Sequence, residues 1–141
     1  MDNNFEPKLV GFLCRWCTYQ AADLAGVGRR RYPPNLVPIR VMCSGRVDPL
    51  FVVRAYLKGA DGVFVGGCHP GDCHYVEGNL KARRRFGIIQ TVFSTLGLEP
   101  ERLRLAWISA SEGQKFATQM NDFNRSIEKL GQNPSAGEVF L

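Results

Sequence analysis

The sequence predicts a small α/β domain in which a four-stranded parallel sheet carries helices on both faces. Three observations lead to this fold class. Four short apolar runs are typical of strands, helical apolar spacing follows them, and each parallel crossover must place its helix over the sheet. At 141 residues, 45% hydrophobic and 22% charged, the chain is large enough to form its own core. We expect one domain over residues 1–141, with irregular tails at 1–7 and 131–141.

The four predicted strands are short apolar runs bounded by glycine, proline or polar residues, which is typical of the buried strands of a parallel sheet. They span residues 9–13, 39–42, 62–65 and 103–108. A loop containing three prolines and three consecutive arginines is predicted at 27–38, and a glycine-rich loop at 66–71.

Four helices are predicted between and after these strands. They are expected at 18–25, from Asp48–Pro49 to Gly59, at about 79–96 and at about 111–130. Apolar residues at helical spacing predict the buried faces of the last three: Leu50, Val53 and Leu57; Ile89, Val92 and Leu96; Phe116, Met120, Phe123, Ile127 and Leu130.

The five cysteines all follow the ends of predicted strands. They are Cys14, Cys17, Cys43, Cys68 and Cys73. Because the carboxyl ends of parallel strands meet at one edge of the sheet, where ligands bind, we expect the five thiols to converge there. Single cysteines are often small buried hydrophobes, but five on one edge favour metal ligands or redox thiols.

Three kinds of thiol chemistry compete for this edge. A structural zinc site takes four thiolates, usually from two short pairs, whereas here the ligands would come from three separate strand ends. A thioredoxin-like dithiol would use Cys14 and Cys17 alone and leave the other three cysteines without a role. An iron-sulfur cluster accepts scattered loop ligands and suits the glycine- and proline-containing loop from Cys68 to Cys73. The spacing favours the cluster and leaves the other two open.

The two histidines also lie beside cysteines. His69 and His74 belong to the same loop, whereas a Rieske site takes a cysteine and a histidine from each of two loops. We therefore interpret them as hydrogen-bond donors around the site or as exposed residues. No carboxylate pair or nucleophile–base arrangement is evident, and the glycine-rich loop lacks the Gly-Lys-Ser/Thr of a phosphate loop.

The net charge of +5 comes from 18 basic and 13 acidic residues. Positive residues cluster at 29–31 and at Lys81 with 83–85, where solvated faces or protein docking are favoured over nucleic acid. No run is apolar for long enough to span a membrane, and residues 1–6 lack the basic and apolar parts of a secretory signal. We therefore expect a cytoplasmic protein without nucleic-acid or membrane partners.

Six segments of the chain form a set of specific motifs. They are Cys14-Arg15-Trp16-Cys17, Ala21-Ala22-Asp23-Leu24-Ala25-Gly26, Arg40-Val41-Met42-Cys43-Ser44-Gly45-Arg46-Val47-Asp48-Pro49, Gly59-Ala60-Asp61-Gly62-Val63, Gly67-Cys68-His69-Pro70-Gly71-Asp72-Cys73-His74-Tyr75 and Trp107-Ile108-Ser109-Ala110-Ser111-Glu112-Gly113. These motifs resemble the delta subunit of methyl-viologen-reducing (F420-non-reducing) hydrogenase, a family of iron-sulfur D subunits. The resemblance covers about residues 8 to 130.

The resemblance implies a non-catalytic [2Fe-2S] protein of methanogenic energy metabolism. Such a protein receives electrons from the large and small subunits of a nickel-iron hydrogenase and passes them to the flavin-containing A subunit of heterodisulfide reductase. Formate dehydrogenase is implied as an alternative electron donor. The five cysteines show no departure from the family pattern.

A [2Fe-2S] cluster with only thiolate ligands takes four of the five cysteines. Cys68 and Cys73 share one glycine- and proline-containing loop, Cys14 and Cys17 form the other short pair, and Cys43 stands alone and is ranked last. Cys43 remains an alternative to Cys17, because it ends a strand that can lie beside the first.

Three further side chains stand beside the thiols in the sequence. Trp16 either shields the cluster, faces a partner or simply packs in the core. Arg15 and Arg46 would favour the reduced, more negative cluster.

Overall fold

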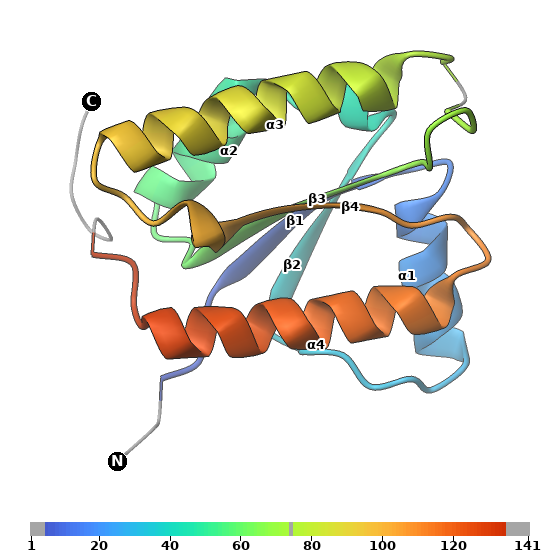
Figure 1. The fold of residues 1–141 in the computed structure, drawn as a ribbon. Helices are drawn as coiled ribbons and strands as arrows, with labels where there is room; N and C mark the ends of the chain where they lie inside the picture. Colours follow the sequence, from blue (N-terminus) through green and yellow to red (C-terminus); the bar gives the residue numbers. More distant parts are fainter. Residues whose placement is uncertain (1–4, 74, 135–141) are drawn as a thin grey trace.

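The computed structural model describes residues 5–73 and 75–134, and it confirms the predicted fold class. Four parallel strands form one sheet in the order β2-β1-β3-β4 (Figure 1). The strands are β1 (Leu9–Cys14), β2 (Leu36–Val41), β3 (Gly62–Gly67) and β4 (Leu103–Trp107). Residues 5–8 and 131–134 are neither helix nor strand, and the rest of the predicted tails, like His74, lies outside the described residues.

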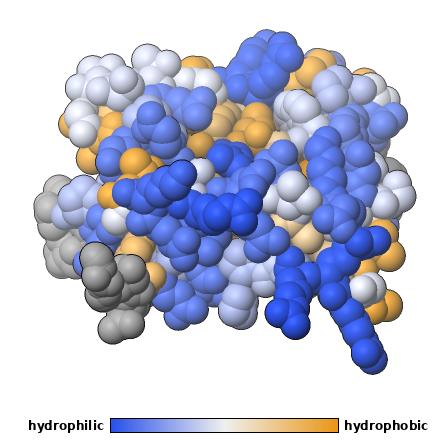
Figure 2. Space-filling view, turned by 60° about the horizontal axis from the view of Figure 1, so that its bottom comes forward, coloured by the Kyte–Doolittle hydropathy of each residue, from blue (hydrophilic) through white to orange (hydrophobic). Residues whose placement is uncertain are grey.

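Helices cover both faces of this sheet. They are α1 (Thr18–Val27), α2 (Pro49–Leu57), α3 (Gly78–Thr95) and α4 (Gly113–Leu130), with short 3-10 helices η1 (Ser44–Arg46) and η2 (Pro100–Arg102). α1 and α4 lie on one face, and α2 and α3 on the other (Figure 1). The outer surface on the α4 side is mostly hydrophilic (Figure 2). Among the described residues, no helix is both long and apolar enough to cross a bilayer.

Each face of the sheet has its own apolar core. The predicted stripe of α4 is confirmed, because Phe116, Met120, Phe123 and Ile127 are fully buried against the sheet and α1, with Leu130 packed beside them. The start of α2 is also as predicted, since Asp48 Oδ1 accepts a hydrogen bond from the Leu50 amide at 2.8 Å and Pro49 follows.

The predicted buried stripes of α2 and α3 are partly wrong. In α2, Leu50 is 56% exposed, whereas Val52 and Tyr56 are buried, so the helix is turned by about one residue from the prediction. In α3, Ile89 is buried as predicted. Val92 and Leu96, however, are 45% and 68% exposed, and the other buried residues of that helix are Gly78, Asn79, Ala82, Phe86 and Phe93. Apolar residues line more than one side of both helices, and packing against the sheet selects the aromatic side.

Strand β2 begins at Leu36, inside the segment predicted as loop. Pro38 belongs to the strand, which is possible because β2 is an edge strand where the missing backbone donor faces solvent. Gly66 and Gly67, also predicted as loop, continue β3 instead. A Cβ atom on Gly66 would overlap the side chain of Thr18 at the start of α1, so glycine permits this close packing.

The strand order creates a switch point at the carboxyl edge of the sheet. The crossover after β1 passes through α1 to β2, whereas the crossover after β3 passes through α3, on the opposite face, to β4 (Figure 1). In open parallel sheets ligands bind where neighbouring connections diverge in this way. The fold therefore places its expected binding site between the ends of β1 and β3.

Candidate metal centre

The strand register brings the cysteine-bearing loops together. Cys14 is the last residue of β1 and pairs with Val41 of β2, so Cys43 follows two residues beyond that pair. Leu13 pairs with Gly66 of β3, and Cys68 follows two residues later. Three loops carrying cysteines therefore leave the sheet at the same level, as predicted from their positions after the strands.

The thiols form one group of three and one pair. The Sγ atoms of Cys14, Cys17 and Cys68 all lie within 4.8 Å of one another, and Cys14 and Cys68 are 3.9 Å apart. Cys43 Sγ and Cys73 Sγ are 3.7 Å apart, and Cys73 also packs against the group of three. Metal–sulfur bonds of about 2.3 Å in a tetrahedral site separate two sulfurs by about 3.8 Å. Both close pairs therefore have the spacing of two ligands on one metal ion.

Two glycines allow the Cys43–Cys73 pair to form. Gly45 in η1 packs against Gly78 at the start of α3, and a Cβ atom on Gly45 would lie 2.8 Å from Gly78 Cα. A Cβ atom on Gly78 would overlap Cys43 Sγ and come within 3.2 Å of Cys73 Sγ. Arg85 strengthens this contact, because its Nη1 atom donates to the Gly45 carbonyl at 2.5 Å.

Backbone amides point toward the sulfurs. The Gly45 amide donates to Cys43 Sγ at 3.4 Å. The pKa of the Cys14 thiol is lowered chiefly by Cys17 and then Cys68, and the backbone amides of Trp16 and Ser44 lower it further. Amide donors of this kind stabilise negative charge on sulfur and tune the potential of thiolate-bound metal clusters.

The thiols cannot all ionise on their own. Hydrogen bonds from Cys17 and then Cys68 lower the pKa of Cys14 to about 3, so one thiolate forms readily. Hydrogen bonding to that thiolate raises the pKa of Cys17 to about 12 and holds the pKa of Cys68 far above its usual range. The pKa of Cys43 is raised to about 11, chiefly because the thiol is buried and to a smaller extent because Cys73 lies beside it. A bound metal cation would offset the repulsion between neighbouring thiolates, because a thiol that coordinates a metal is deprotonated.

The donor set fits a thiolate-bound metal centre. Four of the five thiols are almost completely buried, with Cys14 2% exposed and Cys17, Cys43 and Cys68 each 4% exposed. Buried thiols are poorly placed to attack a substrate disulfide, which disfavours the dithiol enzyme considered from the sequence. Which four thiols bind a metal, and whether it is zinc or iron, stays a prediction.

Two residues to which the sequence assigned no role hold the Cys68 loop. Asn79 is fully buried at the start of α3, and its Nδ2 atom donates to the carbonyls of Cys68 and His69, each at 2.9 Å. Glu112, which precedes α4, lies with Oε1 2.6 Å from His69 Nε2 and also accepts from the Ser109 amide at 2.8 Å. Ser109 and Glu112 have the spacing of a helix capping box, which was the available sequence signal.

The aromatic and basic neighbours lie at the outer side of the thiols. Trp16 is half-buried and packs against the group of three thiols, and its Nε1 atom donates to the Tyr75 hydroxyl at 3.4 Å. The guanidinium of Arg15 lies 5.1 Å from the centre of the Trp16 ring. Arg15 and Arg46 are both exposed. Trp16 thus covers the thiols while its other side reaches solvent.

Three open hollows of about 500 to 540 Å³ lie elsewhere on the described surface. They are lined by the outer side of α3 with η2, by the segment before α4 with the end of α1, and by the region around Lys8 and β2. No cysteine lines any of the three, so these hollows do not bring a small molecule to the thiols.

Comparisons with known proteins agree with this geometry. Residues 9–131 match the family model described as methyl-viologen-reducing hydrogenase, delta subunit. The chain is 56% identical over 131 residues to the vhc iron-sulfur D subunit of F420-non-reducing hydrogenase from Methanococcus voltae, and the match covers 93% of this chain and 91% of the relative. It is 58% identical to the iron-sulfur D subunit of F420-non-reducing hydrogenase from Archaeoglobus profundus, covering 93% of this chain and 96% of the relative.

A different arrangement occurs in Methanosarcina acetivorans. There, 125 residues that are 50% identical to this chain lie within the A subunit of the ferredoxin/F(420)H(2)-dependent CoB-CoM heterodisulfide reductase. They cover 89% of this chain but 16% of that larger protein. The family match and the identities over nearly the full length confirm the resemblance seen in the motifs: the chain belongs to the family of methyl-viologen-reducing hydrogenase delta subunits.

Proposed function

We propose that this protein is the [2Fe-2S] electron carrier of a larger complex. It receives electrons from the large and small subunits of a nickel-iron hydrogenase, or from formate dehydrogenase, and passes them to the flavin-containing A subunit of heterodisulfide reductase. The setting is methanogenic energy metabolism, in the cytoplasm. The observation that carries the proposal is the convergence of five thiols, arranged as a group of three and a pair, on the carboxyl edge of the sheet.

The named relatives support both partners. Separate chains of this family are named as iron-sulfur subunits of hydrogenase, which links the family to hydrogenase. In Methanosarcina acetivorans a segment similar to nearly this whole chain is part of the A subunit of a heterodisulfide reductase. A domain that is covalently joined to a protein in one organism is well placed to bind the corresponding protein as a separate chain in another. We therefore propose the heterodisulfide reductase A subunit as the electron acceptor.

The sulfur geometry supports a particular ligand set. Each iron of a [2Fe-2S] cluster takes two thiolates, and Cys14 with Cys68 (3.9 Å) and Cys43 with Cys73 (3.7 Å) are two pairs with the spacing of two ligands on one iron. Cys43 ranked last on the sequence alone, but its distance to Cys73 favours it over Cys17. We therefore propose Cys14, Cys43, Cys68 and Cys73 as ligands, with Cys17 as the spare thiol.

The residues of the chain perform the remaining tasks of an electron carrier. When bound, the cluster would accept and release one electron at a time. The amides of Gly45, Trp16 and Ser44 direct positive partial charge at the sulfurs, which favours added negative charge. Trp16 limits the access of water on the outer side, and the position at the sheet edge keeps the centre near the surface for a partner.

The composition of the anaerobically purified protein tests the proposal. We expect a brown protein with about two irons and two labile sulfides per chain and an EPR signal after reduction. Alone, it should neither oxidise hydrogen nor cleave the heterodisulfide. Stoichiometric zinc without sulfide would overturn the cluster proposal, and either catalytic activity in the isolated chain would overturn the role as a carrier.

Serine variants test the ligand set. Cys43→Ser should lose most of the iron and the EPR signal, while Cys17→Ser should keep both. If Cys17→Ser instead loses the iron and the EPR signal while Cys43→Ser keeps both, the ranking made from the sequence is correct. A colourless protein that reduces disulfides through Cys14 and Cys17 would instead support the dithiol enzyme.

A further inference from the structure

The segment from Ser109 to Gly113 belongs to the motifs of the family resemblance, yet the proposed electron transfer gives it no role. It follows β4 and leads into α4, and it contains no cysteine. Its glutamate nevertheless reaches the loop that carries Cys68 and Cys73, because Glu112 Oε1 lies 2.6 Å from His69 Nε2. This contact joins two loops that are 43 residues apart in the chain.

Two facts define the chemistry of this contact. The amide of Ser109 first, and then His69, lower the pKa of Glu112 to about 2, so the side chain is a carboxylate at neutral pH. A carboxylate only accepts hydrogen bonds, so His69 donates through Nε2–H. The ring of His69 is thereby held in one orientation beside Cys68. Residues that hydrogen-bond around a metal site without binding the metal commonly orient the metal ligands and tune the properties of the metal.

The Cys68–His69 peptide is held from two sides. Asn79 binds the carbonyls of both residues from the start of α3, and the Asp72 amide donates to the His69 carbonyl at 2.9 Å, closing a turn. These bonds restrain the backbone but leave the His69 side chain free to rotate. The Glu112 contact removes that freedom and anchors the loop to the other face of the sheet, through α4.

We propose that Glu112 is a positioning residue for the metal centre, holding through His69 the loop that carries Cys68. The inference rests on the proposed function, because it requires a cluster at these thiols. Two consequences follow. Loss of the contact loosens the Cys68 loop, so iron leaves the protein faster. Loss of the negative charge alone makes added negative charge on the cluster less unfavourable, so the reduction potential rises.

A purely structural role is the competing explanation. Glu112 and Ser109 close a turn just before α4, because the Glu112 amide donates to the Ser109 carbonyl at 3.0 Å and Glu112 Oε1 accepts from the Ser109 amide at 2.8 Å. In that case loss of Glu112 would lower the stability of α4 and leave the metal centre unchanged. His69 separates the two explanations, since His69→Phe removes the contact to the loop and keeps both bonds of the Ser109–Glu112 turn.

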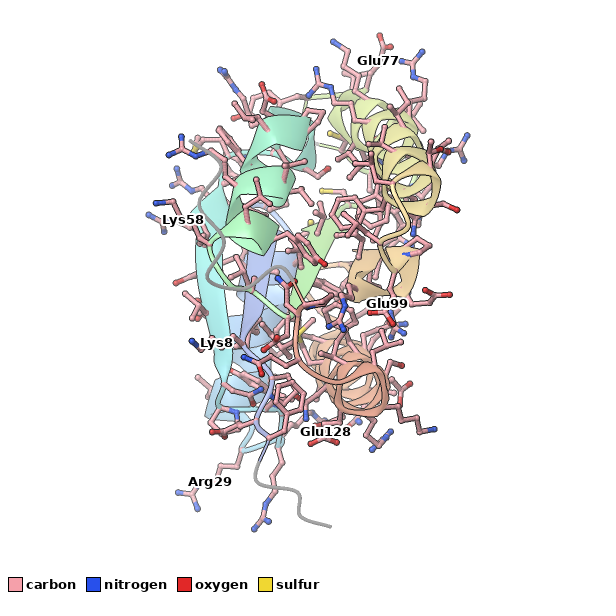
Figure 3. The ribbon with its side chains drawn as sticks, turned by 90° about the vertical axis from the view of Figure 1, so that its left-hand side faces the viewer. Lys8, Arg29, Lys58, Glu77, Glu99 and Glu128 are labelled. Carbon is pink, nitrogen blue, oxygen red and sulfur yellow. The ribbon has the colours of Figure 1, made fainter. Side chains whose placement is uncertain are left out.

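Three variants of the iron-loaded protein provide the test: Glu112→Gln, Glu112→Ala and His69→Phe. The measurements are the rate of iron release to a chelator, the midpoint potential from an EPR-monitored titration, and the melting temperature. Glu128→Gln is the matched control, because it removes the same charge from an exposed position near the far end of α4 (Figure 3). At a helical rise of about 1.5 Å per residue, that position is about 24 Å from Glu112.

We expect His69→Phe and Glu112→Ala to release iron about tenfold faster than the unchanged protein. Combining the two should add little to either alone, because both remove the same contact. Glu112→Gln can still accept both hydrogen bonds, so it should keep its iron and show a more positive potential. Glu128→Gln should change neither property.

Two outcomes would overturn the inference. One is iron release at the unchanged rate in His69→Phe, and the other is a potential in Glu112→Gln equal to that of Glu128→Gln. If Glu112→Ala does not fold, His69→Phe and Glu112→Gln still decide the question. Failure of the proposed function is distinguishable, because the unchanged protein itself would then contain no iron.

Discussion

The two edges of the sheet use polar residues in opposite ways. Figure 3 views the amino edge, with Lys8, Lys58 and Glu99 labelled. At this edge the buried charged side chains are paired with other groups of the same chain. Arg102 is 1% exposed, forms an ion pair with Glu99, and donates to the carbonyls of Asp61, Leu130, Gly131 and Gln132. The Asp61 carboxylate accepts from the amides of Lys8 and Asn133. This edge is closed by its own side chains.

At the carboxyl edge the chain gathers groups that it does not satisfy. The thiols there resist joint ionisation, as the raised pKa values of Cys17 and Cys43 show. Ser44 Oγ and Asn79 Oδ1 lie here and are buried without a hydrogen-bond partner among the described residues; the third such side-chain atom, Tyr56 Oη, lies in the core on the α2 and α3 face. Unpartnered buried polar atoms are costly, and they persist mainly where a binding site requires them.

The difference separates stability from function within one small fold. Damage to the amino edge should lower the free energy of unfolding and spare the metal content of the folded protein. Damage to the carboxyl edge should remove the metal at a smaller cost in stability, because the strands and both cores do not depend on the thiols. Four predictions test this separation, in decreasing order of their effect on stability.

The largest effect is expected for Arg102→Leu. Several buried carbonyls and the segment after α4 would lose their common donor, so we expect a loss of about 3 kcal/mol in the free energy of unfolding. Chemical denaturation followed by circular dichroism measures it, with iron per folded chain as the second readout. Arg125→Leu is the control, because the exposed ion pair of Arg125 with Asp122 contributes less than about 1 kcal/mol to the free energy of unfolding. Equal losses in both variants would contradict the importance of the amino edge.

The second prediction concerns Gly78→Ala. The new methyl group would overlap Cys43 Sγ, so we expect most of the iron to be lost, with a stability cost of about 2 kcal/mol from overpacking. Gly87→Ala on the same helix is the control. Nothing lies within 4 Å of a Cβ atom at Gly87, so that change should stabilise α3 by about 0.5–1 kcal/mol and leave the iron in place. Full iron content in Gly78→Ala would refute the proposed use of Cys43 and Cys73.

The third prediction concerns Asn79→Ala. Two buried carbonyls, those of Cys68 and His69, lose their donor, and we expect a stability cost of about 1 kcal/mol together with faster iron release. Asn79→Asp keeps the shape but places carboxylate oxygens against the two carbonyls, so its effect should be greater. Thermal melting and chelator kinetics measure both variants. An aspartate variant as stable as the unchanged protein would mean that Asn79 does not hold this loop.

Local periodicity explains why much of the fold was predictable. The buried stripe of α4 follows from its spacing alone, and the start of α2 follows from Asp48 and Pro49, because both depend on neighbours in the sequence. The rotation of α2 and α3 was mispredicted because apolar residues such as Leu50 and Val92 lie on more than one side, and only the sheet selects which side is buried. The first half of β2 was predicted as loop because it contains Pro38. A strand accepts proline at the edge of a sheet, but the edge position of β2 follows from the strand order, which no local sequence pattern shows.

The site was predictable to the extent that topology determines it. Cysteines after parallel strands must meet at one edge, and they do. The pairing of Cys43 with Cys73 depends on the backbone contact of Gly45 with Gly78, between segments far apart in the chain, for which the sequence has no separate signal. The contact of Glu112 with His69 is similarly remote. Ser109 and Glu112 have the spacing of a capping box, but this spacing does not show that the Glu112 side chain also contacts His69.

The smallest effect is a pH dependence that originates at Glu112. Its pKa falls from 4.5 to about 2 in the folded protein, chiefly through the Ser109 amide and then through His69. The folded state therefore binds fewer protons there than the unfolded state, and the resulting stability is complete above the unfolded pKa of 4.5 and is lost as the pH falls toward 2. Because the side chain is 35% exposed, solvent screens much of the effect.

The melting temperatures of the unchanged protein and of Glu112→Gln should therefore differ by a constant amount above about pH 5 and converge as the pH is lowered. Glu128→Gln, which removes an exposed carboxylate near the far end of α4, is measured at each pH as the control for the loss of one negative charge. Convergence confined to the Glu112 variant would locate the lost stability at the contact between the loop after β4 and the Cys68 loop. If the curve of the Glu112 variant instead stays at a constant distance from that of the unchanged protein at every pH, the bonds of Ser109 and His69 to this carboxylate do not stabilise the fold, and the two loops are held together by the remaining packing.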